Sequence, residues 1–423
     1  MSFRRIMSIL LVLVLIAAAC GDDDGGSDDT AGAGASTQAS TTTTGTASTT
    51  TEATDTTTTT APTTTTAAPT TTTAAPALPE LGSVGLGPYG VGVQTITITD
   101  GTRNRPLTVD VWFPLADDSA GDLVQYTFVT GDFFESARAL AVDVSSASTD
   151  GPFPLVVYSH GSGGIRYIHS DYTETIASHG YVVVAPDHTG NTSVERVLGT
   201  ADDAELIAYN RPLDVITVID AMVDPANAEA GPYAALVDPE SIAVTGHSFG
   251  GYTTYAVASG TTGNPNGDTP ADDRIDALIP LAPAVTGLLP DDTLALIDQP
   301  TLIIVGADDK TTPVDPHVED AWEASNAVGH YRVELIAGEH QSFTDLCDYV
   351  EVLPGREGAT EIVVETITLM AQEGCSDGDM PIERVKELTN TFAVTFLESV
   401  FGDGEMITAD TNTLPDDIVF AAK

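Results

Sequence analysis

One segment of this 423-residue chain indicates its architecture most directly: Ser241-Ile-Ala-Val-Thr-Gly246-His247-Ser248-Phe249-Gly250-Gly251. Its first part, Ile242 to Thr245, has the composition of a buried strand, and a helical pattern begins at Phe249. A Gly-x-Ser-x-Gly motif between a strand and a helix predicts a sharp turn that lifts the serine hydroxyl out of the sheet. We therefore interpret Ser248 as a candidate nucleophile. The alternative is a tight turn with an incidental serine.

The same five-residue pattern occurs a second time, at Gly374-Cys375-Ser376-Asp377-Gly378. There it follows a helical stretch, Val363 to Ala371, and no strand leads into it. Because the turn needs a strand before the serine, we expect Ser376 to be a loop residue.

On both sides of Ser248, from residue 80 onward, short β-rich segments alternate with helical patterns. This alternation predicts an α/β fold. We expect a mostly parallel, eight-stranded sheet with helices on both faces, in which the first two strands form an antiparallel edge hairpin. Three segments fit no strand–helix unit and are interpreted as insertions around the active-site rim: 116–152, 191–210 and 345–379. The expected strands are 94–99, 107–113, 155–159, 181–185, 242–245, 277–281, 302–305 and 331–336, and the expected helices are 169–178, 213–222, 249–258, 314–326 and 382–400.

A serine hydroxyl becomes a good nucleophile when a histidine, oriented by a carboxylate, accepts its proton. In this fold the acid and then the histidine follow the serine along the chain. Among the downstream histidines, His340 comes directly after a strand, whereas His317 lies in an expected helix and His330 precedes the strand. We predict His340 as the base and expect His317 and His330 at the solvated surface.

Two adjacent aspartates, Asp308 and Asp309, follow the strand 302–305 and are the candidates for the acid. Asp309 fits the spacing Gly-x-x-Asp-x-x-x-Pro and is preferred. Asp308 is then interpreted as a solvated turn residue or as one that helps to shape the loop.

Ester hydrolysis also needs backbone N–H groups directed at the oxygen that becomes negative in the tetrahedral intermediate. Phe249, next to the nucleophile, is expected to supply one. The loop His160-Gly-Ser162-Gly-Gly164 after strand 155–159 is expected to supply the other from Ser162. A phosphate-binding loop is the alternative for these glycines, but no lysine follows at the required spacing.

Several segments of the sequence, within roughly Arg105 to Phe343, resemble the platelet-activating-factor acetylhydrolases and the dienelactone-hydrolase-like serine esterases. The resemblance implies an α/β-hydrolase fold, a triad of Ser248, Asp309 and His340, and an oxyanion hole from Ser162 and Phe249. Ser162 stands where these relatives often have an apolar residue, and a true dienelactone hydrolase would have cysteine at position 248. The strings that carry the resemblance are Pro154-Leu-Val-Val-Tyr-Ser-His-Gly-Ser-Gly-Gly-Ile-Arg166, Ala177-Ser-His-Gly-Tyr-Val-Val-Val-Ala-Pro-Asp-His188, Arg211-Pro-Leu-Asp214, Gly246-His-Ser-Phe-Gly-Gly251 and Gly338-Glu-His-Gln-Ser-Phe343.

The expected activity is hydrolysis of a carboxylic ester through an acyl-serine intermediate, without cofactor or metal. The formal net charge of −47, with 15 Lys and Arg in total, disfavours nucleic acid and anionic substrates. A neutral or zwitterionic ester with a short acyl chain, such as an acetylated lipid, is the favoured substrate. Two alternatives stay open: a polyester or cutin hydrolase, which usually has methionine where Phe249 stands, and a non-catalytic surface lipoprotein that uses the hydrolase scaffold for adhesion.

The N-terminus has the layout of a secretory signal over residues 1–20, with Arg4-Arg5, an apolar run from Ile6 to Ile16, and Ala17-Ala-Ala-Cys20. Cys20 stands where bacterial lipoproteins carry their lipid anchor; cleavage after Ala19 without lipidation is the alternative. Residues 21–79 are rich in Thr, Ala and Pro, which predicts a disordered linker before a catalytic domain at 80–423. We thus expect a location outside the cytoplasm, on the cell membrane or secreted.

The two remaining cysteines, Cys347 and Cys375, form an even pair in that oxidising compartment. A disulfide between them is expected; two buried free thiols are the alternative.

Overall fold

The computed structural model describes residues 80–117, 119–128, 131–356 and 359–423. The expected signal segment, the lipid anchor at Cys20 and the linker 21–79 lie outside the described residues. Within the described residues, no helix combines the length and the apolar character that a membrane span requires.

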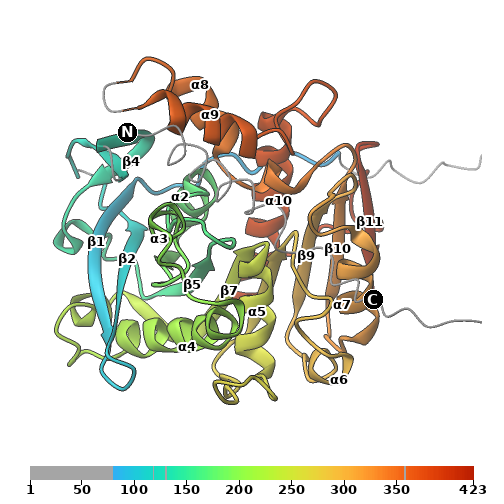
Figure 1. The fold of residues 1–423 in the computed structure, drawn as a ribbon, viewed down its shortest axis with the longest axis horizontal. Helices are drawn as coiled ribbons and strands as arrows, with labels where there is room; N and C mark the ends of the chain where they lie inside the picture. The colour runs from blue at the N-terminus through green and yellow to red at the C-terminus, as the bar shows by residue number, and fades with distance from the viewer. Residues whose placement is uncertain (1–79, 118, 129–130, 357–358) are drawn as a thin grey trace, which may run out of the picture. The chain divides into compact units, whose positions relative to one another are not determined.

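The centre of the structure is a single sheet with strand order β11-β10-β9-β8-β7-β5-β6-β2-β1-β4-β3 (Figure 1). The strands from β10 to β6 run parallel, and β11 and β2 pair antiparallel at either end of that parallel block. The bounds are β1 Val91–Asp100, β2 Arg105–Pro114, β3 Leu123–Phe128, β4 Gly131–Ala141, β5 Phe153–Ser159, β6 Val182–Pro186, β7 Val237–His247, β8 Ala277–Leu281, β9 Thr301–Gly306, β10 His330–Leu335 and β11 Ile418–Ala422.

All eight expected strands are present, and β1 and β2 form the expected antiparallel hairpin. The expectation of eight strands in total is wrong, because β3, β4 and β11 extend the sheet at its edges. The strands β3 and β4 lie in the segment 116–152 that was interpreted as a rim insertion. Register shifts interrupt their pairing, so this hairpin lacks the regular alternation by which strands are predicted.

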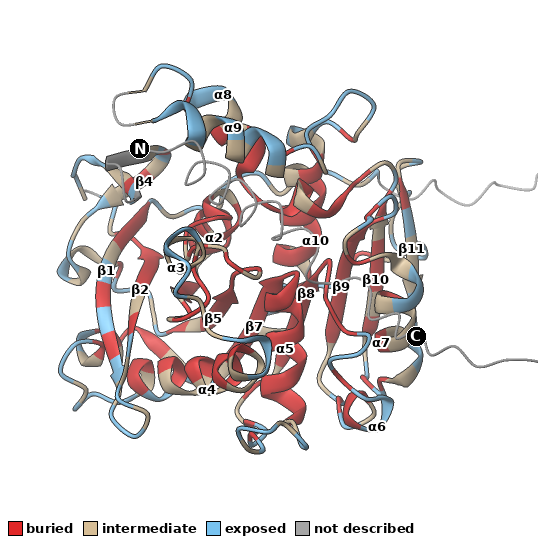
Figure 2. Cartoon of the chain, viewed as in Figure 1, coloured by how far each residue is buried: buried red, intermediate tan, exposed pale blue. Residues whose placement is uncertain are grey.

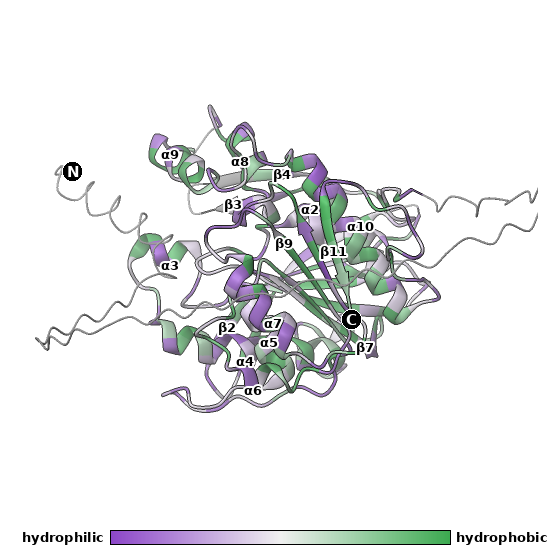
Figure 3. Ribbon diagram, turned by 90° about the vertical axis from the view of Figure 1, so that its right-hand side faces the viewer, coloured by the Kyte–Doolittle hydropathy of each residue, from purple (hydrophilic) through white to green (hydrophobic). Residues whose placement is uncertain are grey.

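Helices cover both faces of the sheet (Figure 3). On one face α2 and α10 contact each other, and on the other face α4 packs against α5. The bounds are α2 Ser170–Ser178, α3 Ser193–Leu198, α4 Ala204–Val223, α5 Phe249–Ser259, α6 Asp291–Leu294, α7 Glu319–Ala324, α8 Leu346–Val352, α9 Glu361–Met370 and α10 Ile382–Phe401, with short helical turns at Val144–Ser146, Gly231–Tyr233, Val314–Val318 and His340–Phe343.

The core lies where the parallel strands are covered by helices on both sides (Figure 2). Every residue of β6, β8 and β9 is buried, and so is every residue of α5. Such strands read as continuous apolar runs, which is why their positions were predictable. Their carboxyl ends meet at one edge of the sheet, and the loops that follow β5, β7, β9 and β10 meet there.

Candidate active site

Ser248 occupies a strained turn between β7 and α5, with backbone angles φ 58° and ψ −117°. The flanking glycines are a steric requirement. A Cβ atom on Gly250 would stand 1.9 Å from the carbonyl oxygen of Ser159, and one on Gly246 would stand 2.5 Å from that of Gly250. A non-glycine residue with positive φ is costly, so the surrounding packing holds Ser248 in this conformation.

Three side chains from distant parts of the sequence are joined by hydrogen bonds at this turn. They are Ser248, His340 and Asp309, and we refer to these three residues as the row. His340 Nε2 lies 2.9 Å from Ser248 Oγ, and His340 Nδ1 lies 2.8 Å from Asp309 Oδ2. Because a carboxylate only accepts hydrogen bonds, Nδ1 carries the proton and Nε2 faces the serine hydroxyl as an acceptor. The structure thus brings together the three residues that the sequence singled out, in the arrangement that proton removal from Ser248 needs.

The two adjacent aspartates differ in their burial and in their contacts. Asp309 is 5% exposed and accepts hydrogen bonds from the backbone N–H groups of Thr311 and Thr312 in addition to that from His340. Asp308 is exposed, and its backbone N–H donates to Gly338. Thr312 is a residue that sequence reasoning missed: its hydroxyl lies 2.9 Å from Asp309 Oδ2 and 3.1 Å from His340 Nδ1.

The other two downstream histidines lie away from this row. His317 is partly buried, and its Nδ1 accepts hydrogen bonds from the backbone N–H groups of Val285 and Thr286. The expectation that His330 is a solvated surface residue is wrong. Its side chain is fully buried in β10 against the ring of Trp322, because α7 covers this part of the sheet edge.

The loop His160–Gly164 after β5 lies directly against Ser248. A Cβ on Gly161 would stand 3.2 Å from His247 Nδ1, which is a tight contact, and 3.4 Å from Ser248 Cβ, so glycine at this position eases the close approach of the loop. Within the described parts of the chain, the backbone N–H groups of Ser162 and Phe249 have no hydrogen-bond acceptor. The hydroxyl oxygen of Ser162 accepts hydrogen bonds from Arg196 Nη2 at 2.8 Å and from Asn191 Nδ2 at 3.4 Å.

A second histidine, His247, fixes the backbone of the loop that carries His340. Its Nε2 donates to the carbonyl oxygen of His340 over 3.0 Å, and the two rings lie 4.7 Å apart. Burial, with a smaller effect of His340, holds the pKa of His247 well below its ordinary value. His247 is therefore neutral and holds the loop without placing a positive charge beside the row.

A polar network fills the space beneath the loop 160–164. His188 donates from Nδ1 to Asp214 over 3.0 Å and has Nε2 2.9 Å from Ser159 Oγ, while Asp214 also binds Arg105. Burial lowers the pKa of His188 to about 4. Sequence reasoning assigned no role to these residues, although Arg211 and Asp214 stood in a string that carried the resemblance.

The serine of the second Gly-x-Ser-x-Gly pattern behaves as expected. Ser376 is exposed, and its hydroxyl donates to the carbonyl oxygen of Gln372 rather than to a histidine.

The expected disulfide between Cys347 and Cys375 is present. It joins α8 to the loop that contains Glu373, whose carboxylate accepts hydrogen bonds from the N–H groups of Lys310 and Thr311 next to Asp309.

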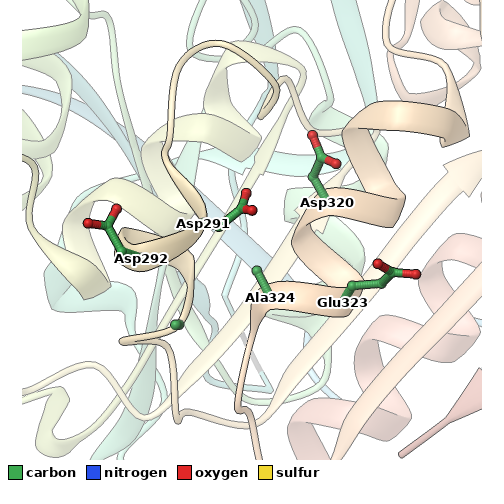
Figure 4. A pocket seen from close by; sticks show the side chains of 6 residues that line it. Asp291, Asp292, Asp320, Glu323 and Ala324 are labelled. Atoms are coloured by element: carbon green, nitrogen blue, oxygen red, sulfur yellow. The ribbon is translucent and has the colours of Figure 1, made fainter.

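A hollow between α6 and α7 lies outside this row. Figure 4 shows carboxylates from both helices around it, and no residue of the row lines it. Its lining is Asp291, Asp292, Ala295, Asp320, Glu323 and Ala324. We interpret it as part of the acidic surface.

The mostly parallel sheet with helices on both faces, and the turn that carries Ser248, give this chain an α/β-hydrolase fold. The solved structure of a ferulic acid esterase from Streptomyces cinnamoneus superposes with a TM-score of 0.59 over 82% of this chain and 99% of that chain. The identity is 21%, so this likeness shows the fold alone.

Within that class, the chain resembles the platelet-activating-factor acetylhydrolases, as the sequence strings predicted. The family model of platelet-activating factor acetylhydrolase, isoform II, matches residues 125–208, which include the loop 160–164 but not Ser248, Asp309 or His340. The platelet-activating factor acetylhydrolase of Bos taurus is 27% identical over 123 residues. The match spans 25% of this chain and 27% of that relative.

Proposed function

We propose that this protein hydrolyses carboxylic esters through an acyl-serine intermediate. The observation that carries the proposal is the hydrogen-bonded row of Ser248, His340 and Asp309 at the strained turn after β7. In the proposed reaction, Ser248 Oγ attacks the ester carbonyl carbon while His340 Nε2 accepts the hydroxyl proton. Asp309 keeps the proton on Nδ1 and stabilises the imidazolium that forms.

The carbonyl oxygen becomes negative in the tetrahedral intermediate, and the free N–H groups of Phe249 and Ser162 are the proposed donors to it. Removal of one such donor typically costs about 10²–10³ in rate. His340 then passes its proton to the leaving alcohol as the C–O bond breaks. A water molecule, deprotonated by His340, attacks the acyl-serine and releases the acid, so the net reaction is ester plus water to acid plus alcohol.

The proposed substrates are neutral or zwitterionic esters with a short acyl chain. The net charge of −47 supports this choice because it disfavours anionic substrates. The resemblance to platelet-activating-factor acetylhydrolases supports an acetylated lipid among them. A polyester or cutin hydrolase is the alternative enzyme, and a non-catalytic adhesion protein is the alternative of another class.

A fluorophosphonate probe separates an enzyme from an inactive scaffold, because it modifies only an activated serine. We expect one label per chain in the wild type and none in Ser248→Ala. The matched control is Ser376→Ala, which changes the serine of the second Gly-x-Ser-x-Gly pattern and should label fully. An unlabelled wild-type protein would favour the adhesion protein.

Relative rates on several substrates separate the two candidate enzymes. We expect nitrophenyl acetate and an acetylated phospholipid to be hydrolysed faster than nitrophenyl esters of long-chain acids, and a polyester film to be the slowest. Faster release of product from the film than from the soluble acetate would favour the polyester hydrolase.

The proposed location is outside the cytoplasm, with the catalytic domain 80–423 joined through the linker 21–79 to a lipid on Cys20. The disulfide between Cys347 and Cys375 supports an oxidising compartment. Expression of the full chain in a bacterial host should place it in the membrane fraction, and Cys20→Ala should abolish lipid attachment measured by intact mass. A soluble wild-type chain that begins at Cys20 would contradict the anchor.

A further inference from the structure

Arg211 of α4 is fully buried directly behind the loop 160–164. Its guanidinium donates from Nη2 to the carbonyl oxygen of Gly161 over 3.0 Å and from Nη1 to that of His160 over 2.5 Å. Its Nε and Nη2 both donate to Asn191 Oδ1, at 3.0 and 2.6 Å. Every one of these acceptors is uncharged, which is unusual for a buried cation.

The acidic side chain that follows Arg211 on α4 does not neutralise this charge by contact. Asp214 lies one turn further along α4, but its carboxylate binds Arg105, Arg103 and His188. In the part of the chain that the structure describes, no carboxylate oxygen lies within salt-bridge distance of Arg211. Burial lowers the pKa of Arg211 to about 9, which leaves it charged at neutral pH. A buried cation whose hydrogen-bond acceptors are the neutral carbonyl oxygens and, at 3.3 Å, the Ser159 hydroxyl is expensive, so a purely structural role is a weak explanation for it.

The contact with Gly161 fixes the direction of the next N–H group. The peptide bond between Gly161 and Ser162 is trans, and in a trans peptide the C=O and N–H bonds point in opposite directions. The Gly161 carbonyl is directed at Arg211 and also accepts from His160 Nδ1 and from the N–H of Gly164. The N–H of Ser162 is therefore directed away from Arg211, and it has no protein acceptor within the described residues.

The same guanidinium also contacts the residue that carries the other free N–H. Its carbon lies 5.2 Å from the centre of the Phe249 ring, which is within the range of a cation–π interaction. Phe249 follows Ser248 at the first position of α5. One buried cation thus touches both segments from which the oxyanion donors are expected.

We propose that Arg211 is a positioning residue for ester hydrolysis: it holds the Gly161–Ser162 peptide and the Phe249 side chain so that both N–H groups are fixed before the substrate binds. This rests on the ester-hydrolase function proposed above. Its positive charge also lies behind the loop, where it favours the negative oxygen of the tetrahedral intermediate. Loss of Arg211 removes one of the three hydrogen bonds that hold the Gly161 carbonyl, which loosens the peptide and lets the N–H of Ser162 turn out of the site.

The test compares an ester with its thionoester, because the larger and less basic sulfur is a poor acceptor for an oxyanion hole. We expect Arg211→Lys and Arg211→Gln to lower kcat/KM for nitrophenyl acetate about 100-fold, the usual effect of losing an oxyanion donor. For the matching O-nitrophenyl thionoacetate the decrease should be much smaller, so the oxo-to-thiono rate ratio collapses. A variant that merely contains less folded protein would lower both rates equally and leave the ratio unchanged, which would overturn the proposal.

Arg332→Lys is the matched control, since Arg332 is a buried arginine on β10 that pairs with Glu319 and Glu334 away from the row. Its rate ratio should equal that of the wild type. Should both Arg211 variants fail to fold, Asn191→Ala carries the same test, because it removes the acceptor that anchors Nε and Nη2. An unchanged ratio in folded Asn191→Ala would also count against the proposal.

The experiments distinguish a failure of the proposed ester-hydrolase function from a failure of the proposed role of Arg211. A wild-type protein that neither takes up the fluorophosphonate nor hydrolyses nitrophenyl acetate refutes the ester-hydrolase proposal. A wild type that does both, together with Arg211 variants that keep the wild-type rate ratio, refutes only the role of Arg211.

Discussion

At the scale of single residues, Asp308 and Asp309 are neighbours with different environments. Only Asp309 is buried and contacts the imidazole of His340. We expect Asp309→Asn to lower kcat for nitrophenyl acetate about 10⁴-fold. The amide favours the tautomer of His340 in which Nε2 carries a proton, and this nitrogen then cannot accept the proton of Ser248. The measurement is the steady-state rate at neutral pH.

Asp308→Asn is the matched control for this substitution. It makes the same chemical change one residue away, on an exposed side chain, and should leave kcat within about twofold of the wild type. Equal losses in the two variants would mean that the loop, and not the contact with His340, is what matters.

The residues of the row were predictable because each has a local signal in the sequence. Ser248 stands in a motif of fixed spacing, and His340 and Asp309 each follow a recognisable strand. The burial of His330 and the position of Arg211 had no such signal. Both depend on which helix covers which part of the sheet, and that is decided by contacts between residues far apart in the chain.

At the scale of elements, the turn between β7 and α5 has no room for an added side-chain atom at its glycines. We expect Gly250→Ala to destabilise the protein by about 1–3 kcal/mol or more, because the added Cβ would stand 1.9 Å from the Ser159 carbonyl oxygen. The measurement is the free energy of unfolding in urea. Gly101→Ala, in the β1–β2 turn with no atom within 4 Å of the added Cβ, should change it little.

The disulfide between Cys347 and Cys375 ties α8 to the loop that binds the Asp309 segment. It joins cysteines 28 residues apart, and a disulfide of this span typically stabilises a protein by about 2–4 kcal/mol. We expect dithiothreitol to lower both the Tm and the esterase rate, since Glu373 then holds the N–H groups of Lys310 and Thr311 less firmly.

The control for this effect is the double variant Cys347→Ala, Cys375→Ala. It should start from the lower Tm and show no further response to the reductant. A response of the same size as in the wild type would trace the effect to another group.

The elements themselves were predictable in proportion to their burial. The strands β5 to β10 lie under helices and read as apolar runs, and each was located from sequence. The strands β3, β4 and β11, which lie at or next to the edges of the sheet, were missed. At an edge a strand needs fewer apolar residues, and its partner is fixed only by the packing of the finished sheet.

At the scale of the whole molecule, the surface and the interior differ in their charge. The chain carries a net charge of −47, and the hollow between α6 and α7 is lined by four carboxylates. In the interior, by contrast, most ionisable groups near the row are paired or neutral. Five of the eight histidines are buried with lowered pKa values: His160, His169, His188, His247 and His330.

These neutral histidines predict that stability falls as the pH falls below about 6.5. In the unfolded chain each takes up a proton near that pH, whereas the folded protein resists protonation down to a pH of about 4 for His188 and about 3 for His169 and His330. The unfolded state therefore binds more protons in this window, and each such histidine lowers the unfolding free energy by about 1.4 kcal/mol per pH unit.

His330 offers the cleanest test of this pH dependence. Burial lowers its pKa, and neither of its ring nitrogens has a hydrogen-bond partner in the described part of the structure, so removing the imidazole breaks no hydrogen bond. We expect His330→Leu to fold. Between pH 6 and pH 4.5 its free energy of unfolding, measured in urea titrations, should decrease by about 2 kcal/mol less than that of the wild type. Parallel curves for the two proteins would mean that His330 is protonated in the folded state, against the environment that Trp322 and β10 provide.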